Sequence, residues 1–546
     1  MPPGVAPAPA ADRSTWAPLR MRTYRLVWFA QMAALTGTWM HMVGAQWLLV
    51  QQSDSAFLVA LVQAATALPM VVLALPAGVL ADVVDRRRLL VCALAGQATV
   101  AVTLTLVTWA DQATAVLLLS LTFLLAAGAA LALPAWQSLL FDLVPRDAIP
   151  AVAALNGVNA NIARAVGPAV AGLLISASGA EWVFAANALS FSLVVAVLVR
   201  LRPGPIPETS QVPEALLSAL WAGTRYLRHS AVVRRALLRT GLFIFPAVGL
   251  WALLPVLATG ALQLGATGYG VLLSVLGAGA IAGAFLRRPL EERLAQETLL
   301  GCATATYTGF SMVVALTDQP LLAGSALFVT GGAWLVAFAV LSGVIQLALP
   351  SWVRARGVSG YLLVVMLGQA AGSAVWGGVA DKTGVQAALM AAAGTLALVG
   401  VLALRLPLIA DAPDTSPSQH WPEPQLSFVP APDDGPVLVT SVYSVAPEQA
   451  AAFIAAMRDV ERSRRRTGAT WWVLSQDGAD RERFVEIYSV ASWGEHLRQH
   501  SGRATMADRA AEDRAKSFTD GRGVVATHLF SCGMQPVPRG IQEPSF

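Results

Sequence analysis

Apolar residues follow one another in long runs through the first three quarters of the chain. An α-helix needs about 20 such residues to cross the hydrocarbon core of a bilayer, where backbone polar groups must bond within their own segment. Twelve runs have this character: 24–48, 56–80, 89–110, 114–134, 153–176, 182–202, 240–259, 266–286, 296–316, 320–345, 358–380 and 384–408. The pattern predicts an all-α polytopic membrane protein with twelve transmembrane helices.

The pattern changes after residue 408. Residues 409–435 are rich in Pro, Ser and Asp, which is typical of an extended linker. Beyond the linker, strand-like and helix-like segments alternate in the order βαββαβ: 437–445, 447–466, 469–476, 483–490, 493–500 with 504–518, and 523–530. This order predicts a C-terminal α+β domain of the ferredoxin-like type.

Composition supports the division. Residues 1–408 hold 38 charged residues, whereas the 138 residues that follow hold 32. The first part is too poor in charge for a soluble globule, so a single water-soluble enzyme is excluded. The net charge of +4 gives no reason to expect nucleic acid as a partner. Cys92, Cys302 and Cys532 form no cluster, so neither a disulfide framework nor a zinc site is indicated.

Arginines in the loops test the topology. In a twelve-span arrangement, 21 arginines fall on one side of the membrane, and Lys382 is the one basic residue on the other. This positive-inside pattern predicts a bacterial inner-membrane protein with both termini in the cytoplasm. The expected parts are a cytoplasmic tail (1–22), a six-helix bundle (23–202), a cytoplasmic loop (203–237), a second six-helix bundle (238–408), a linker (409–435), the ferredoxin-like domain (436–535) and a C-terminal tail (536–546).

The two bundles carry an internal repeat. Six pairs of identical residues share one offset of 205 positions: Ala77 and Ala282, Gly78 and Gly283, Arg88 and Arg293, Pro145 and Pro350, Gly167 and Gly372, and Gly172 and Gly377. Two halves in parallel repeat predict a central cavity at their interface, near the middle of the membrane.

Two motifs resemble those of the major facilitator superfamily. Residues 78–90 (GVLADVVDRRRLL) resemble its cytoplasmic gating loop, with the matching residues Gly78, Asp82, Arg86, Arg87 and Arg88. Val83 and Asp85 depart from that pattern, and a merely basic loop is the alternative. On the fifth span, Gly167, Pro168 and Gly172 resemble the antiporter motif of exporters in this superfamily, although a packing role fits these residues equally well.

Polar residues at membrane depth are candidates for a cavity or for coupling. Arg164 is the one clear charge in mid-membrane, and His41 is the one group there that could titrate near neutral pH. Four amides could line a cavity or serve as interhelical contacts: Gln31, Gln46, Asn156 and Asn159. No buried carboxylate is convincing, so coupling to protons is implied by the resemblance alone.

The resemblance over residues 20–408 is to the bacterial branch that includes the enterobactin exporter. In the C-terminal domain, residues 464–468 (RRRTG) and 495–500 (EHLRQH) resemble the antibiotic-biosynthesis-monooxygenase superfamily, whose members pair as dimers, so a homodimer through this domain is implied. His496 and His500 share a helix face at a spacing that suits a metal, but a solvated face is the preferred interpretation, and no metal, cofactor or catalytic site is expected.

The chain is therefore interpreted as a transporter and not as an enzyme. It is expected to export a small amphipathic molecule, such as a drug, a siderophore or a secondary metabolite, by alternating access coupled to protons. Two alternatives stay open: uptake by the same fold, or a transporter whose C-terminal domain senses or modifies the cargo.

Overall fold

The computed structural model describes residues 14–200, 216–403, 426–519 and 524–531, together with residues 405, 407–408, 414–418, 420–421 and 424. The chain divides into two compact units. We call the first the helical unit (Met1–Ser210, Leu238–Leu341 and Leu362–Pro407) and the second the tail unit (Gln211–Leu237, Ser342–Tyr361 and Leu408–Phe546). Cys532 and the predicted C-terminal tail 536–546 lie outside the described residues.

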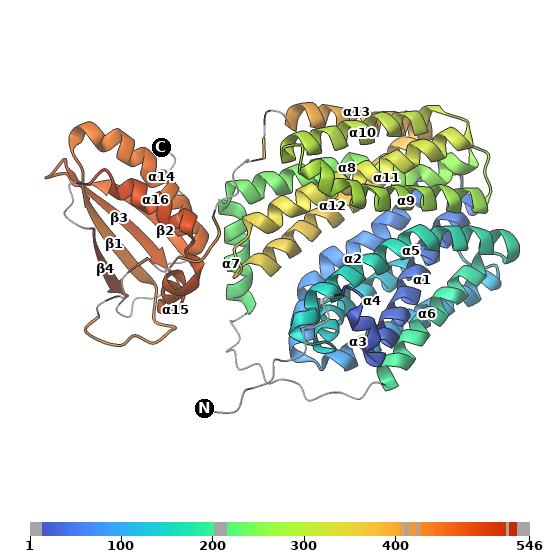
Figure 1. Ribbon diagram of the computed structural model, residues 1–546, viewed down its shortest axis with the longest axis horizontal. Coiled ribbons are helices and arrows are strands. Elements are labelled where there is room, and N and C mark those ends of the chain that lie inside the picture. The colour runs from blue at the N-terminus through green and yellow to red at the C-terminus, as the bar shows by residue number, and fades with distance from the viewer. Residues whose placement is uncertain are drawn as a thin grey trace, which may run out of the picture. The chain divides into compact units, whose positions relative to one another are not determined.

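The helical unit is built from two sets of six long helices, of which α8, α11 and α12 extend into the tail unit at one end (Figure 1). The first set is α1 (Arg22–Gln52), α2 (Ala56–Val83), α3 (Arg86–Trp109), α4 (Ala115–Asp142), α5 (Ile149–Ser178) and α6 (Ala180–Arg200). The second set is α8 (Ala231–Thr259), α9 (Ala266–Glu291), α10 (Gln296–Leu316), α11 (Pro320–Ala348), α12 (Arg354–Thr383) and α13 (Val385–Ala403). Short 3₁₀ turns at Ala17–Arg20 and Arg146–Ala148 precede α1 and α5.

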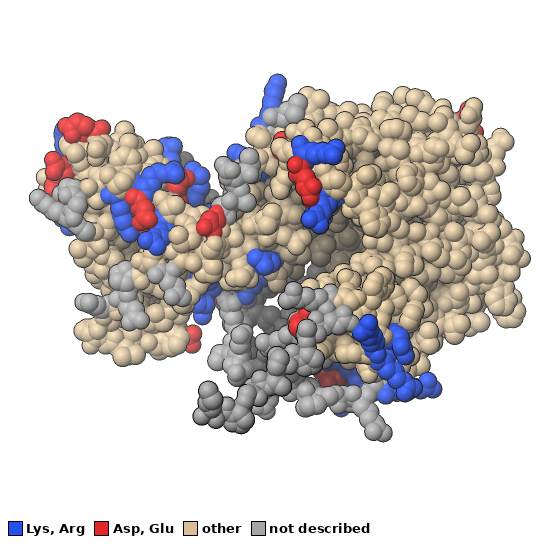
Figure 2. Space-filling model, viewed as in Figure 1, with Lys and Arg blue, Asp and Glu red and all other residues tan. Residues whose placement is uncertain are grey.

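Among the described residues, 11 helices are long and apolar enough to cross a membrane. The helix left out is α1, which has 31 residues but carries Gln31, His41 and Gln46 along its length. Each of the twelve predicted runs lies largely within one helix, yet a count of twelve spans stays a prediction. On the face seen in Figure 2, charged side chains of the helical unit gather near helix ends, and the remaining surface is almost free of charge.

Contacts within the first set of helices build its core. Helix α1 packs against α5 and α6, while α4 packs against α2 and α3. Leu90, Leu94, Phe191 and Leu198 are among the buried side chains between α3 and α6. Between the two sets, α5 packs along α9. We call the interface between the two sets the seam, and the candidate site lies on it.

The C-terminal domain has a four-stranded antiparallel sheet in the order β2-β3-β1-β4. Its elements are β1 (Val437–Ser444), a 3₁₀ turn (Pro447–Gln449), α14 (Ala450–Thr467), β2 (Ala469–Gln476), β3 (Arg483–Val490), α15 (Trp493–Arg498), the π-helical turn η4 (Gln499–Arg503), α16 (Met506–Lys516) and β4 (Val525–Phe530). This strand order is consistent with the predicted ferredoxin-like domain.

The predicted linker 409–435 is not an extended spacer where it is described. Pro417 forms a bridge to Thr505, and the Trp493 N–H donates to the carbonyl of Asp434. The side chain of Trp421 donates to Glu512 at 2.9 Å. The Pro-rich composition predicted an extended linker, but the side chains of His420 and Trp421 both contact Glu512 of the domain. This segment is therefore part of the tail unit.

A helix that the sequence analysis missed, α7 (Leu216–His229), also belongs to the tail unit. The Tyr226 hydroxyl donates to the carbonyl of Ala348 at 3.0 Å, and the guanidinium of Arg466 lies 5.9 Å from the Tyr226 ring. Arg225 forms an ion pair with Glu495 at 3.6 Å. The C-terminal domain, α7 and the turn between α11 and α12 therefore form one body.

Candidate functional site

Glycines allow the helices of the seam to approach closely. A Cβ on Gly167 of α5 would lie 2.7 Å from the Cβ of Trp39 on α1, and one on Gly172 would lie 2.6 Å from the carbonyl of Ala266 on α9. Side chains larger than hydrogen do not fit at such distances. The antiporter-like motif thus packs α5 against its own half through Gly167 and against the other half through Gly172. Pro168, the third residue of the motif, is also buried.

The repeat partners of these glycines make the corresponding contacts. A Cβ on Gly372 of α12 would collide with the carbonyl of Phe245 on α8, the first helix of its own half. A Cβ on Gly377 would lie 2.7 Å from the Cβ of Ala60 on α2, the second helix of the other half. The internal repeat is therefore a repeat of contacts as well as of residues, and the two halves meet in a pseudo-symmetric manner.

Polar groups join the halves at the end where α2 and α9 begin. The carboxylate of Asp381 on α12 accepts from the Ser55 hydroxyl at 2.8 Å and from the Phe57 N–H at 3.0 Å. Across the pseudo-symmetric contact, the hydroxyls of Ser176 and Thr267 lie 2.8 Å apart. A carboxylate at the first turn of α2 also complements the dipole of that helix.

Arg164 lies near the middle of α5, beside aromatic side chains from both halves. Its guanidinium is 5.7 Å from the centre of the Trp39 ring, and that ring is 6.3 Å from the ring of Trp251 on α8. Trp334 of α11 continues the row, 6.0 Å from Trp251. Among the described residues, no carboxylate is seen to pair with Arg164, and its Nε is buried without a hydrogen-bond partner.

Gln46 also spans the seam. It is fully buried on α1, and its Oε1 accepts a hydrogen bond of 2.6 Å from the Tyr269 hydroxyl of α9. The ring of Tyr269 stacks on that of Trp47 with the centres 6.4 Å apart. Within the described part of the chain, the Nε2 of Gln46 and the Nε1 of Trp251 are buried without partners. Arg164, Gln46 and Trp251 thus hold donors that a bound molecule could use.

The other predicted polar residues are not brought to the seam by any contact described here. His41 is buried inside the first half, where its Nε2 lies 3.2 Å from the Thr122 hydroxyl of α4. Asn159 donates to the carbonyl of Trp28 on α1 at 3.2 Å. Gln31 and Asn156 each have a buried oxygen without a partner among the described residues. The Nδ1 of His41 and the Oδ1 of Asn159 are likewise buried without a partner among the described residues, so each of these two side chains is only partly satisfied.

The basic loop lies at the start of α3. Asp85 caps this helix by accepting from the Arg88 N–H at 2.8 Å, and Arg87 donates to the last carbonyls of α6, those of Leu198 and Val199. Arg86 is exposed, and a Cβ on Gly78 would meet nothing within 4 Å. The side chain of Asp82, the acidic residue of the gating-loop motif, lies outside the described residues.

A second site was not anticipated from the sequence. Helices α8, α10, α11 and α13 line a partly open apolar pocket of about 500 Å³ in the second half. At its edge Arg239, which is 7% exposed, pairs with Glu297 at 2.5 Å. Neither residue stands out in sequence, because each lies at the end of its apolar run, where charges are ordinary.

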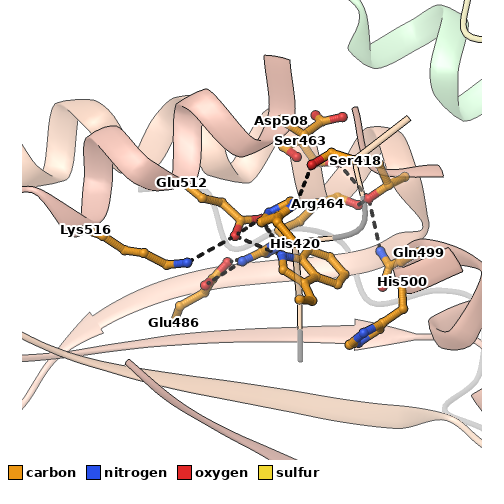
Figure 3. A network of polar contacts seen from close by, with 12 residues as sticks. Ser418, His420, Ser463, Arg464, Glu486, Gln499, His500, Asp508, Glu512 and Lys516 are labelled. Carbon is orange, nitrogen blue, oxygen red and sulfur yellow. Dashed lines mark hydrogen bonds and ion pairs between the residues drawn. The ribbon is translucent and has the colours of Figure 1, made fainter. Parts of the chain in front are cut away.

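The C-terminal domain has a buried ionic network (Figure 3). Arg464 of α14 is 5% exposed and pairs with Glu486 of β3 at 3.0 Å and with Glu512 of α16 at 2.5 Å. Burial acts to raise the pKa of Glu512, but Arg464, His420 and Trp421 outweigh it and hold this pKa at about 2. The burial of Arg464 is not visible in the sequence, because its partners come from two other elements.

Comparison with known proteins gives a consistent result. A protein family described as transmembrane secretion effectors, within the major facilitator superfamily, matches residues 13–534. The multidrug efflux pump Tap of Mycobacterium tuberculosis is 26% identical over 405 residues, which cover 71% of this chain and 94% of the pump. The staphyloferrin A transporter of Staphylococcus aureus is 25% identical over 167 residues, which cover 30% of this chain and 42% of that transporter.

Solved structures resemble the fold at low sequence identity. A bacterial homologue of the lysosomal transporter Spinster, in an inward-facing and unoccupied conformation, has a TM-score of 0.57 at 15% identity, over 71% of this chain and 95% of its own. The nucleoside transporter NupG has a TM-score of 0.54 at 13% identity, over 71% of this chain and 99% of its own. The relatives and the fold are those of transporters, as the sequence analysis predicted, and not of enzymes.

Proposed function

The chain belongs to the transmembrane secretion effector family of major facilitator superfamily transporters, and from this membership we propose that it exports small amphipathic organic molecules. The two halves would expose a site at their seam to each side of the membrane in turn. The proton gradient across a bacterial inner membrane would drive the cycle. Drugs, siderophores and secondary metabolites are the cargo classes that this proposal includes.

The observation that carries the proposal is the group formed by Arg164, Trp39 and Trp251 at the seam. Aromatic faces bind the apolar part of an amphipathic molecule, and a guanidinium that has no carboxylate partner among the described residues can bind an anionic or strongly polar group. The unpartnered donors of Gln46 and Trp251 add hydrogen-bonding capacity. A charged residue at membrane depth without a structural partner is a functional candidate by default.

The direction of opening follows from the loops. If the arginine-rich ends face the cytoplasm, the end joined by Asp381, Ser55 and Thr267 faces outward. The polar contacts between the halves described above then close the outer end, so this conformation would accept cargo from the cytoplasm. The name of the Tap pump, multidrug efflux, supports export of drugs, and that of the staphyloferrin A transporter supports siderophores as cargo.

Transport in oriented vesicles tests the proposal. Inverted vesicles that contain the full chain should accumulate compounds from a panel of antibiotics, dyes and siderophores, and an uncoupler should abolish the accumulation. Accumulation in right-side-out vesicles instead would show uptake. No gradient-dependent movement of any compound in either orientation would contradict a secondary transporter for these cargo classes.

Substitution of Arg164 tests the site itself. We expect Arg164→Ala to lower the apparent affinity for an exported anionic compound about tenfold or more, because a hydrogen bond to a charged group contributes about 1.5–3 kcal/mol. Arg164→Lys should keep part of the activity, since the charge remains. Arg288→Ala is the matched control, because Arg288 is an exposed arginine near the end of α9. Equal effects of the Arg164 and Arg288 changes would place the cargo elsewhere.

A further inference from the structure

We propose that the C-terminal domain binds one divalent transition-metal ion through the imidazoles of His496, His500 and His528. His496 lies on α15, His500 on the π-helical turn η4 and His528 on β4. The spacing of the first two was visible in sequence, but His528 is brought beside them only by the sheet, where it pairs in register with Val439. His496 is 1% exposed, so the expectation of a solvated helix face was wrong for this residue.

The three side chains present nitrogen atoms to one point. The Nε2 of His496 lies 2.8 Å from the Nε2 of His528 and 3.1 Å from the Nε2 of His500, and one ligand atom from each histidine lies within 4.8 Å of the others. A tetrahedral ion with metal–nitrogen bonds of about 2.0–2.1 Å holds its ligand nitrogens about 3.3 Å apart. Small side-chain shifts would therefore complete such a site.

Hydrogen bonds around His496 fix which of its nitrogens is free. The Thr467 hydroxyl donates to the carbonyl of Ser463 at 2.9 Å, so it must accept the 3.1 Å hydrogen bond from Gln499. The amide nitrogen of Gln499 thus faces Thr467, and its oxygen faces the Nδ1 of His496 at 3.1 Å. Nδ1 therefore carries the proton, and Nε2 has a free lone pair that points at the other two histidines.

The surroundings keep the imidazoles neutral. Burial, together with the charges of His500 and His528, lowers the pKa of His496 to about 3, and burial is also the main cause that lowers the pKa of His500 to about 4. Burial lowers the pKa of His528 as well. Neutral histidine is the form that binds metals, so no proton has to leave these rings at neutral pH.

The wider environment suits a cation enclosed by aromatic rings. Trp421 lies with its ring centre 4.8 Å from that of His500, and Trp493 lies 5.4 Å from His496. The nearby cation Arg464 is paired with both Glu486 and Glu512, and Lys516 also pairs with Glu512, so the charges of this network balance. Three imidazoles without a thiolate favour Zn²⁺, Cu²⁺, Ni²⁺ or Co²⁺ over Mg²⁺ or Ca²⁺.

Metal titration of the full chain tests the proposal. The protein is purified in detergent through a tag without histidine, and Zn²⁺ binding is measured by competition with a chelating dye. We expect one Zn²⁺ per chain, and we expect Co²⁺ to give the visible absorption of a four-coordinate ion. Gln499 acts as a positioning residue, so Gln499→Ala should weaken Zn²⁺ binding about 10–100-fold.

Ligand variants and a matched histidine identify the site. His500→Ala and His528→Ala should each abolish the Zn²⁺ site, whereas His229→Ala on α7 should bind as the unchanged protein does. Hydrogen exchange of β1 and β3 without metal shows whether each variant keeps its fold. If a variant does not fold, the visible absorption of Co²⁺ bound to the unchanged protein tests whether the ion is four-coordinate, as the proposed site requires. Absence of stoichiometric binding to the unchanged protein, or equal loss in His229→Ala, would overturn the site, and neither outcome depends on transport.

Discussion

Asp381 joins the two halves of the helical unit through one side chain. It accepts one hydrogen bond from a hydroxyl and one from a backbone N–H at the start of α2. Among the described residues, it is the one carboxylate that makes such a contact between the halves. Because the contact is exposed to solvent, its net contribution should be about 1 kcal/mol, which is enough to change the ratio of two conformations about fivefold.

We therefore expect Asp381→Asn to favour opening of this end. The measurement is labelling of Ala266→Cys, whose buried position faces Gly172, by a membrane-impermeant maleimide in a chain without other cysteines. Labelling should become about fivefold faster. Asp318→Asn is the control, since Asp318 is an exposed aspartate expected on the same side of the membrane. Equal rates in the two variants would show that Asp381 does not hold this end closed.

Glu512 gives the C-terminal domain a specific response to acid. Its pKa is about 2 in the folded chain against an ordinary value of 4.5, so the unfolded chain binds the proton more tightly. The stabilisation by Glu512 is complete above about pH 4.5 and is lost as the pH falls toward 2, and it amounts to about 3 kcal/mol. Hydrogen exchange of α16 in the full chain, corrected for intrinsic rates, should show this loss.

Two variants assign that acid response. Glu512→Gln should remove it and should destabilise α16 at neutral pH, because Arg464 loses one of its two carboxylates. Asp513→Asn changes the neighbouring, exposed carboxylate and should keep the profile of the unchanged protein. If Asp513→Asn alters the acid response as much as Glu512→Gln does, the assignment to Glu512 is wrong.

The helices were predictable because their signal is local. A run of about 20 apolar residues identifies a membrane helix without knowledge of its neighbours. Helix α7 was missed because 14 amphipathic residues with several arginines read as a basic loop. The role of His528 and the burial of Arg464 could not be predicted, since both depend on which strands and helices meet. Patterns carried by one helix can be read from the sequence, whereas sites formed between elements cannot.

One face of the C-terminal sheet is apolar and is not covered by its helices. Helices α14 and α16 lie against the other face (Figure 1). On the uncovered face, Trp471 is 49% exposed, Val525 67% and Leu529 49%. The sequence analysis implied a homodimer through this domain, and we propose that a second copy covers this face, because exposed apolar patches mark interaction sites and homo-oligomers most often have two-fold symmetry.

The mass of the full chain in detergent should then be that of a dimer at micromolar concentration. Leu529→Asp should raise the dissociation constant more than tenfold, because a two-fold interface loses this side chain twice, at about 1.5–3 kcal/mol each. Ile454→Asp is the control, as Ile454 is 42% exposed on the helical side of the sheet. A monomer for the unchanged protein, or equal effects of both substitutions, would contradict this interface.

The pseudo-symmetry of the two halves connects residues that are far apart in sequence. Gly172 lets α5 meet the start of α9, and Gly377 lets α12 meet the start of α2. Both contacts lie at the end of the helical unit that Asp381 joins. An alternating-access cycle must close this end at one stage and open it at another, so the two glycines should be equivalent in transport although they belong to different halves.

Larger side chains at either glycine should therefore stop the same step. In Gly172→Leu and in Gly377→Leu the new side chain would collide with the carbonyl of Ala266 or with Ala60, so closure of this end should fail and transport should be lost in both. The Cys labelling assay described above should then report a permanently accessible end. Gly157→Leu on α5 should be tolerated, because a Cβ there meets nothing within 4 Å. If only one of the two variants loses transport, the two halves are not equivalent in the transport cycle. The contacts of Gly172 and Gly377 would then be alike in structure but not in function.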